Sequence, residues 1–197
     1  KNITATDRLK LCRTQQSIHP AGEKQVPQHV LYQNAELMEK VSSQFRKAFG
    51  QDIMIDFRGG SRIPIHVGLK PDSSLIDRVG DNYVNSVRAN PDLANQGDGM
   101  KGYAAILFET MVSELDINLL DEPEAFLHPP QMRQLGETLA SEVNGQLIVA
   151  THSSDIMRGF LEGANGNIRI LRICRTGTKN SVSETHPNAI KELWERP

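Results

Sequence analysis

Two short apolar runs, each followed at once by polar side chains, constrain the fold of this chain more than any other feature. Ile117–Leu120 lead into the carboxylates Asp121 and Glu122. The second run, Gln146–Ala150, leads into Thr151–His152–Ser153. Such runs are typical of parallel strands that are buried in a sheet and end at a ligand-binding edge. One helical pattern separates them, so the sequence predicts two parallel strands joined by a right-handed crossover.

The rest of the chain mixes predicted helices and strands, which indicates the fold class α/β with a mainly parallel core sheet flanked by helices. An apolar residue at every fourth position predicts a helix over Asn34–Phe49, and Gly102–Leu115 carries a similar apolar stripe. Two alternating runs around Gly59–Gly60 predict a small β-hairpin. Further elements are expected as follows: a strand entering a loop in 1–12, loop in 13–30, a helix within 75–87, helices after Pro129–Pro130, over 155–161 and from 188, and strands near 168–174 and 181–184.

The organisation of the chain changes near residue 97, where the pattern becomes regular. Residues 1–96 are expected to form a partial N-terminal lobe with the β-hairpin and polar loops, and residues 97–197 a C-terminal lobe. The sequence begins with Lys1 and no methionine, and it ends at Pro197 within a helical pattern. We therefore expect it to be a piece of a longer protein.

Composition excludes several classes of protein. A hydrophobic content of 38% and a charged content of 23% indicate a globular domain with its own core and not a disordered chain. The net charge of -2 gives no overall attraction to nucleic acid or to an anionic membrane. No apolar run approaches the roughly 18 residues of a membrane span. The two cysteines are far apart in sequence, and we expect a reduced pair in a cytoplasmic protein that needs no membrane.

The adjacent carboxylates Asp121 and Glu122 suggest phosphate chemistry. Successive strand residues point to opposite sides, so the two acids cannot do the same work. Asp121 is the candidate ligand of Mg²⁺, usually through water, and Glu122 is the candidate general base for an attacking water. The alternative is a strand that ends in two solvated acids. Glu124, two residues further on, could orient the loop or be a plain surface acid.

His152 follows the second strand, at the edge where the first strand ends. Parallel strands joined by one helix place their carboxyl ends side by side, so we expect His152 to converge with Glu122. A neutral imidazole there can donate a hydrogen bond to a γ-phosphate and orient the water. A purely structural histidine is the alternative.

Gly97, Asp98 and Gly99 precede a predicted helix. Glycines at a helix N-terminus let backbone N–H groups approach a phosphate. Loops often end in glycine before a helix, so this signal is weak alone. Its place shortly before Asp121 and Glu122 makes it a candidate phosphate-binding segment.

Three segments together resemble the signature loop, the Walker B strand and the switch histidine of ABC-class ATPases. They are QGDGMK (96–101), DEPEAFLHP (121–129) and VATHSS (149–154). The DEPEAFLHP and VATHSS strings are most similar to the SMC-like and OLD-type (overcoming lysogenisation defect) ATPases. The resemblance covers about residues 97–173, and residues 189–194 look like the segment that precedes an effector domain, often a nuclease, in OLD-like proteins.

This resemblance implies a P-loop NTPase fold and a head that binds and hydrolyses ATP with Mg²⁺. It implies a second ATPase head as partner, with Gly97, Asp98 and Gly99 contacting the γ-phosphate in trans and His128 lying in the inter-subunit loop. It also implies that hydrolysis gates an effector acting on nucleic acid, possible partners being a nuclease and the nucleic acid itself, in antiviral defence or DNA repair.

The sequence departs from this family pattern in two places. Gly97 stands where transporter ATPases carry a serine, and G-x-x-x-x-G-K-[ST] occurs nowhere in the chain. We therefore expect the P-loop in an upstream segment and no ATPase activity from the 197 residues alone. An ABC transporter ATPase subunit and a non-catalytic scaffold derived from an ATPase are the two alternatives.

Overall fold

A three-stranded parallel sheet lies at the centre of the part of the molecule that concerns function. The computed structural model describes residues 2–3, 5–71, 78–113, 115–164, 167–188 and 190. Among these residues the sheet has the order β1-β6-β7, with strands β1 (Asn2–Ile3), β6 (Ile117–Asp121) and β7 (Gln146–Ala150). β6 and β7 pair in parallel from Ile117 with Gln146 to Asp121 with Ala150. The predicted pair of parallel strands is confirmed with its predicted bounds.

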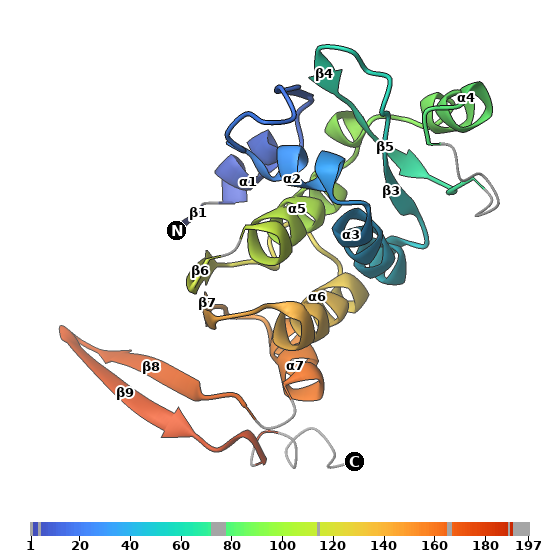
Figure 1. Ribbon diagram of the computed structural model, residues 1–197. Helices are drawn as coiled ribbons and strands as arrows, with labels where there is room; N and C mark the ends of the chain where they lie inside the picture. The colour runs from blue at the N-terminus through green and yellow to red at the C-terminus, as the bar shows by residue number, and fades with distance from the viewer. Residues whose placement is uncertain are drawn as a thin grey trace.

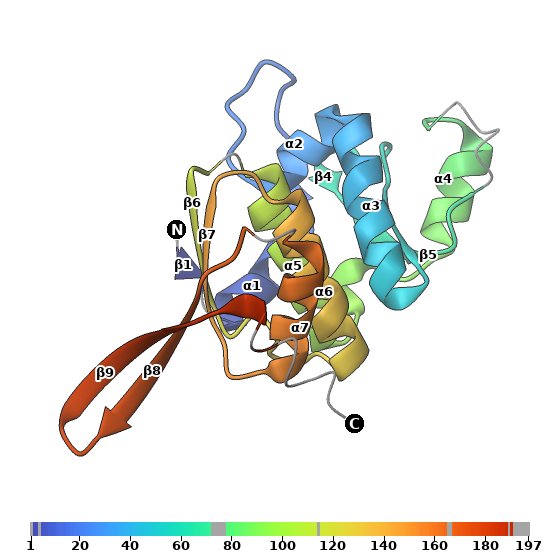
Figure 2. The same ribbon diagram turned by 90° about the horizontal axis from the view of Figure 1, so that it is seen from below.

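Helices cover one face of this sheet (Figures 1 and 2). They are α5 (Asp98–Leu107), which continues into the π-helix η2 (Phe108–Val112), α6 (Pro129–Glu142) and α7 (Ser154–Gly163). α6 begins with the two prolines, which suit a first turn because they need no hydrogen-bond donor there. α6 and α7 approach closely because Gly159 carries no side chain: a Cβ there would lie 2.0 Å from the Arg133 carbonyl oxygen. These helices bury Leu120 in a core with other large apolar side chains, among them Tyr103, Leu107, Leu135, Leu139 and Ile156.

The opposite face of the sheet is bare in the part of the chain that the structure describes, which corrects the prediction of fully buried strands. Ile117, Leu119 and Ile148 are exposed by 50%, 40% and 52%. The side chains of β6 alternate between exposed and buried, as successive strand residues point to opposite sides. The helices cover only the face that carries Leu120. Both faces of the sheet therefore carry apolar side chains, but only one face is buried.

The N-terminal region differs from its prediction at two places. The strand expected to enter a loop in 1–12 is short, and the helix α1 (Ala5–Leu11) follows it. Arg8 and Cys12 are both buried and lie four residues apart, the spacing of one helix face. The expected loop 13–30 contains the strand β2 (Gln15–Gln16) and the start of helix α2 (Pro27–Gln33), because Pro27 begins a helix there and does not interrupt one.

The helix predicted over Asn34–Phe49 is confirmed as α3 (Ala35–Phe49). The Asn34 side chain caps it by accepting a hydrogen bond of 2.9 Å from the Leu37 N–H. Gly50 ends it with φ of 68°, a left-handed conformation that glycine adopts without strain. Val41 and Phe45 are fully buried, as the apolar stripe predicts.

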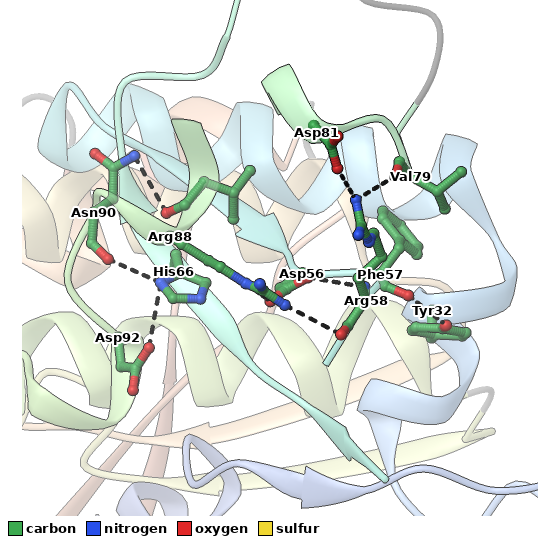
Figure 3. A network of polar contacts seen from close by, with 11 residues as sticks. Tyr32, Asp56, Phe57, Arg58, His66, Val79, Asp81, Arg88, Asn90 and Asp92 are labelled. Atoms are coloured by element: carbon green, nitrogen blue, oxygen red, sulfur yellow. Dashed lines mark hydrogen bonds and ion pairs between the residues drawn. The ribbon is translucent and has the colours of Figure 1, made fainter. Parts of the chain in front are cut away.

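The predicted β-hairpin is present as β3 (Asp52–Ile55) paired antiparallel with β5 (Ile65–Gly68). Between them, β4 (Arg62–Ile63) pairs with β2. All residues of β3 and β5 are buried on both faces, so their alternation in sequence does not mark a solvent side. The helix expected within 75–87 is α4 (Asp81–Arg88); residues 72–77 lie outside the described residues. Polar contacts link α4 to the hairpin, including Arg88 Nε with Asp56 Oδ2 at 2.7 Å (Figure 3).

A second hairpin, β8 (Ile170–Thr176) and β9 (Lys179–Thr185), projects from the body of the molecule (Figure 1). It confirms the two predicted strands, and three of its apolar side chains are exposed: Leu171, Ile173 and Val182. The helix expected from residue 188 and the tail 189–194 fall almost wholly outside the described residues. One hydrophobic cluster joins residues from both sides of position 97, and the division into two lobes stays a prediction. No described helix combines the length and the apolar composition of a membrane span.

Candidate functional site

Glu122 and His152 lie together at the carboxyl ends of β6 and β7. The Glu122 N–H donates to the Ala150 carbonyl oxygen at 2.9 Å, which extends the strand pairing by one step. The His152 Nδ1 atom lies 3.3 Å from Glu122 Oε1. Their side chains are exposed by 77% and 59%, so both are open to a ligand. The topology thus brings the carboxylate and the imidazole together, as the sequence predicted. Their catalytic roles stay predictions.

The backbone at Glu122 adopts an unusual conformation. Its φ is 43°, in the left-handed region that residues other than glycine seldom occupy. The turn that follows is closed by the Ala125 N–H, which donates to the Glu122 carbonyl oxygen at 3.2 Å. Such strain persists only where surrounding contacts hold it, and it is found most often at functional sites. The conformation turns the chain sharply where the strand ends.

A buried arginine forms hydrogen bonds to the backbone of this turn. Arg8 of α1 is 2% exposed, and its Nη2 donates to the carbonyl oxygens of Asp121 at 2.5 Å and Glu122 at 3.1 Å. Burial lowers the pKa of the Arg8 guanidinium, and the charges of Glu124, Asp121 and Glu122 oppose that shift. The sequence reasoning missed Arg8. No motif or periodicity marks it, and it is distant in sequence from the turn that it contacts.

Glu124 is a buried acid, so the alternative of a plain surface acid is wrong. Its side chain is 5% exposed. Its Oε1 accepts hydrogen bonds from the Thr151 hydroxyl at 2.5 Å and from the His152 N–H at 3.3 Å. The same oxygen lies 3.6 Å from His152 Nδ1. Glu124 therefore connects the loop after β6 to the loop after β7.

Asp121 is exposed at the last position of β6. Among the described residues, no group of three or more histidine, cysteine or acidic side chains could hold a metal ion. Mg²⁺ seldom needs such a cage, because it keeps several waters and binds one or two carboxylates together with substrate phosphates. A single exposed carboxylate at a strand end fits that requirement. Its role as a metal ligand stays a prediction.

The segment Gly97–Gly99 lies at the start of α5. Gly97 precedes the helix without a side-chain cap, and a Cβ at this position would meet no atom within 4 Å. Asp98 pairs with Lys101 at 2.8 Å. Gly99 lies directly against the loop after β6, since a Cβ there would be 2.6 Å from the Phe126 carbonyl oxygen. The candidate phosphate-binding segment therefore touches the loop that begins at Glu122, through Gly99 and Phe126.

His128 is the residue that precedes α6, and its side chain is exposed. Its carbonyl oxygen accepts a hydrogen bond from the Met132 N–H at 3.0 Å. It takes no part in the ion pairs described for His152. Phe126, on the same loop, has φ of 69° and is 59% exposed. The loop thus presents an aromatic ring and an imidazole to solvent beside the start of α5.

Comparison with known families decides the class of this domain. Residues 59–158, about half of the chain, match the family described as "AAA domain, putative AbiEii toxin, Type IV TA system". The chain belongs to this AAA-domain family. The matched range includes Gly97–Gly99, the acids of the DEPEAFLHP segment and His152. The matched range therefore contains every site residue that the sequence predicted, whereas Arg8 lies outside it.

Solved structures of SMC heads share the fold of this AAA-family domain. The SmcHead bound to the C-winged helix domain of ScpA aligns with a TM-score of 0.63 and 14% identity, over 96% of this chain and 57% of that one. A structure from work on ATP-driven dimerization and DNA-stimulated activation of SMC ATPases gives 0.53 and 17%, over 84% and 93%. The Smc head domain from Pyrococcus furiosus, bound to the C-terminal domain of ScpA, gives 0.56 and 13%, over 82% and 37%.

At these identities the likeness shows the fold alone. The chain spans 93% of one of these structures but 57% and 37% of the other two. No curated protein matches the sequence. Family and fold together confirm an ATPase-like domain of the AAA family, with a P-loop NTPase fold like that of SMC heads and with small sheets. The narrower OLD-type resemblance stays a prediction.

Proposed function

We propose that this chain carries the hydrolytic half of an SMC-like ATPase head. The observation that supports the proposal most is the 3.3 Å contact between Glu122 Oε1 and His152 Nδ1, at the exposed ends of two parallel strands. Hydrolysis of a nucleoside triphosphate needs a group that orients or deprotonates water beside a group that binds the transferred phosphate. The AAA-domain family and the SMC-head fold support ATP as the substrate.

In the proposed reaction, a water oxygen attacks the γ-phosphorus of ATP and the bond to the bridging oxygen of ADP breaks. Glu122 accepts the proton that the water releases, and the products are ADP and inorganic phosphate. Its side chain is exposed enough to reach a water, and it lies beside His152.

His152 binds the γ-phosphate in this scheme. Its Nδ1 atom faces the carboxylates of Glu122 and Glu124, which leaves Nε2 for a phosphate oxygen. A ring N–H at Nε2 can donate a hydrogen bond to that oxygen.

Asp121 is the residue proposed to hold Mg²⁺. Its exposed carboxylate beside Glu122 fits a hydrated Mg²⁺ that also binds phosphates. When bound, Mg²⁺ supplies positive charge that neutralises the phosphate oxygens. The backbone of Asp121 is held in place, because its carbonyl oxygen accepts a hydrogen bond from Arg8.

The loop that cradles the phosphates is proposed to come from polypeptide outside these 197 residues. The sequence contains no G-x-x-x-x-G-K-[ST] segment, which normally supplies that loop. We expect the complete protein to hydrolyse ATP and the 197-residue chain alone to be inactive. Within the SMC-like group, the DEPEAFLHP and VATHSS strings favour an OLD-type head.

A second head is proposed to complete the site. Gly97, Asp98 and Gly99 would face a γ-phosphate bound to the partner head, and His128 would touch the nucleotide or the partner. The open space at Gly97 and the exposed loop with Phe126 support this surface as an interface. One of the similar SMC structures comes from work on ATP-driven dimerization, which is the behaviour proposed for this chain.

The proposed role of hydrolysis is to gate an effector that acts on nucleic acid, such as a linked nuclease in antiviral defence or DNA repair. Its support is indirect: the resemblance to OLD-type proteins, and the DNA-stimulated activation described for SMC ATPases. The cytoplasmic location expected from the sequence stays a prediction.

Replacement of Glu122 tests the central role. In the complete protein, Glu122→Gln should keep ATP affinity within about threefold and lower turnover by about 10²- to 10⁴-fold, because the amide cannot accept the proton. Glu162→Gln at the far end of α7 is the matched control and should leave turnover unchanged. Undiminished hydrolysis by Glu122→Gln would refute Glu122 as the base.

A further inference from the structure

A buried cation lies directly under the turn that carries the proposed base. The Nη2 of Arg8 donates hydrogen bonds to two main-chain carbonyl oxygens, those of Asp121 and Glu122. Buried arginines are usually paired with a carboxylate in a fork-like geometry. Here the guanidinium binds the peptide backbone, and the bound carbonyls belong to the two residues proposed for Mg²⁺ and for water. Arg8 therefore fixes the path of the chain at the site.

The conformation at Glu122 explains why such a contact is needed. A left-handed φ is unfavourable for glutamate and relaxes unless other contacts hold it. The Glu122 N–H is fixed by the Ala150 carbonyl, and the Glu122 carbonyl is fixed by Arg8 and by the Ala125 N–H. The peptide groups on both sides of the Glu122 Cα are thus restrained. The direction of its side chain follows from that restraint.

Glu124 is a buried carboxylate that contacts the loop after β7. Its Oε1 holds the Thr151 hydroxyl and the His152 N–H, while its Oε2 is buried without a hydrogen-bond partner among the described residues. The Nε of Arg8 is buried in the same unpartnered way. The charge of Glu124 also acts on Arg8. Two buried residues of opposite charge therefore hold the two loops of the site: Arg8 binds the carbonyl oxygens of Asp121 and Glu122, and Glu124 binds Thr151 and His152.

We propose that Arg8 and Glu124 are two buried positioning residues: Arg8 sets the direction of the Glu122 carboxylate, and Glu124 sets the place of the His152 ring. The proposal rests on the proposed ATPase function. Neither residue touches the substrate; Arg8 acts through Glu122, and Glu124 acts through His152. Together the two residues join three parts of the chain, namely α1, the turn after β6 and the loop after β7.

Arg8→Lys in the complete protein is the first test. Lysine keeps the positive charge, but its side chain ends one bond short of the Nη2 position that binds both carbonyls. We expect the turnover number to fall by about tenfold or more, while KM and the affinity for ATP change by less than about twofold, because only the alignment of Glu122 is lost. The matched control is Arg88→Lys, which alters an arginine paired with Asp56 away from the site (Figure 3). It should leave turnover unchanged.

A double-mutant cycle separates positioning from a general structural effect. If Arg8 acts through Glu122, adding Arg8→Lys to Glu122→Gln should slow the residual turnover by less than about twofold. An equal loss in both backgrounds would overturn the proposal, as would wild-type turnover in Arg8→Lys alone. Normal turnover in Glu122→Gln would instead refute the proposed function, and this outcome is distinct from the other two.

Glu124→Gln is the second variant and decides the matter if Arg8→Lys does not fold. It keeps the size of the side chain and one carbonyl acceptor for Thr151 but removes the negative charge beside His152. We expect turnover to fall by about tenfold with ATP affinity retained, and the loss to shrink in a His152→Ala background. A folded Glu124→Gln protein with wild-type turnover would overturn the proposal.

Discussion

Two histidine–carboxylate pairs in the described part of the chain have nearly equal lengths but different surroundings. His152 Nδ1 lies 3.3 Å from Glu122, with side chains 77% and 59% exposed. His66 Nδ1 lies 3.2 Å from Asp92, with side chains 9% and 40% exposed. The first pair joins the ends of two parallel strands. The second joins a residue inside β5 to the segment that follows α4 (Figure 3).

The comparison shows that distance alone does not define a site. His66 Nδ1 is also 2.8 Å from the Asn90 carbonyl oxygen, and a backbone bridge joins His66 to Asp92. The imidazole therefore connects β5 to the segment that follows α4. His152 lies beyond the last paired residue of β7 and is open to solvent, as a group that meets a ligand must be. The end of a parallel strand, and not the ion pair, marks the candidate site.

The largest expected difference between the two pairs lies in catalysis. His152→Ala in the complete protein should lower ATP turnover by about 10- to 10³-fold, because the γ-phosphate loses its imidazole contact. Its free energy of unfolding should change by less than about 0.5 kcal/mol, since the side chain is exposed. Steady-state hydrolysis and denaturant unfolding measure the two effects.

His66→Ala is the matched control for that experiment. It should leave turnover within about twofold and lower the free energy of unfolding by about 1–3 kcal/mol, because the buried His66 ring is lost and the Asn90 carbonyl loses its partner. The contrast fails if His66→Ala abolishes turnover in a folded protein, or if His152→Ala leaves turnover intact.

Two glycines near the site sharpen the comparison between open and enclosed positions. Gly99→Ser should lower the free energy of unfolding by about 1–3 kcal/mol, because its Cβ would press on the Phe126 carbonyl oxygen. Gly97→Ser has open space and places a good capping residue before α5, so its effect should stay within about 1 kcal/mol. Denaturant unfolding of both variants measures the pair. Equal costs would show that Gly99 is not pressed against the loop.

Much of this arrangement could be predicted from the sequence. The bounds of β6 and β7 follow from short apolar runs that end in polar residues, and parallel pairing then places Glu122 beside His152. The helix α3 follows from a regular stripe, an asparagine cap and a terminal glycine. Each of these features is local, or depends on one simple rule of topology.

Other features depend on contacts that no local pattern carries. Arg8 lies 113 residues before Asp121 in sequence, so only the folded chain reveals their contact. The left-handed backbone of Glu122 could not be predicted from the sequence, because the residue is not a glycine. The seven-residue helix α1 is too short to show a helical period, and Pro27 suits both a loop and a helix start. The bare sheet face could not be seen either, because composition does not show what covers a strand.

An effect confined to alkaline pH concerns ionisable groups in the core, in contrast to the exposed site. Burial raises the pKa of the Cys12 thiol from 9.0 to about 12 and that of the Tyr103 hydroxyl from 10.0 to about 12. Both groups stay protonated in the folded chain while they ionise in the unfolded one. The free energy of unfolding should therefore hold below pH 9 and fall between pH 9 and 12, by up to about 1.4 kcal/mol per pH unit for each group.

Denaturant unfolding at several alkaline pH values checks this expectation. Cys12→Ala removes one of the two groups, so its free energy of unfolding should fall less steeply between pH 9 and 10, where Tyr103 contributes little. A stability that stays constant from pH 8 to pH 11 would contradict the burial of these two groups.

The most direct measurement is an experimental structure of the complete Glu122→Gln protein bound to ATP and Mg²⁺. The account predicts a γ-phosphate oxygen within hydrogen-bond distance of His152, Mg²⁺ on the side of Asp121, and a water between residue 122 and the γ-phosphorus. A nucleotide bound elsewhere, with His152 and residue 122 facing away from it, would contradict the account.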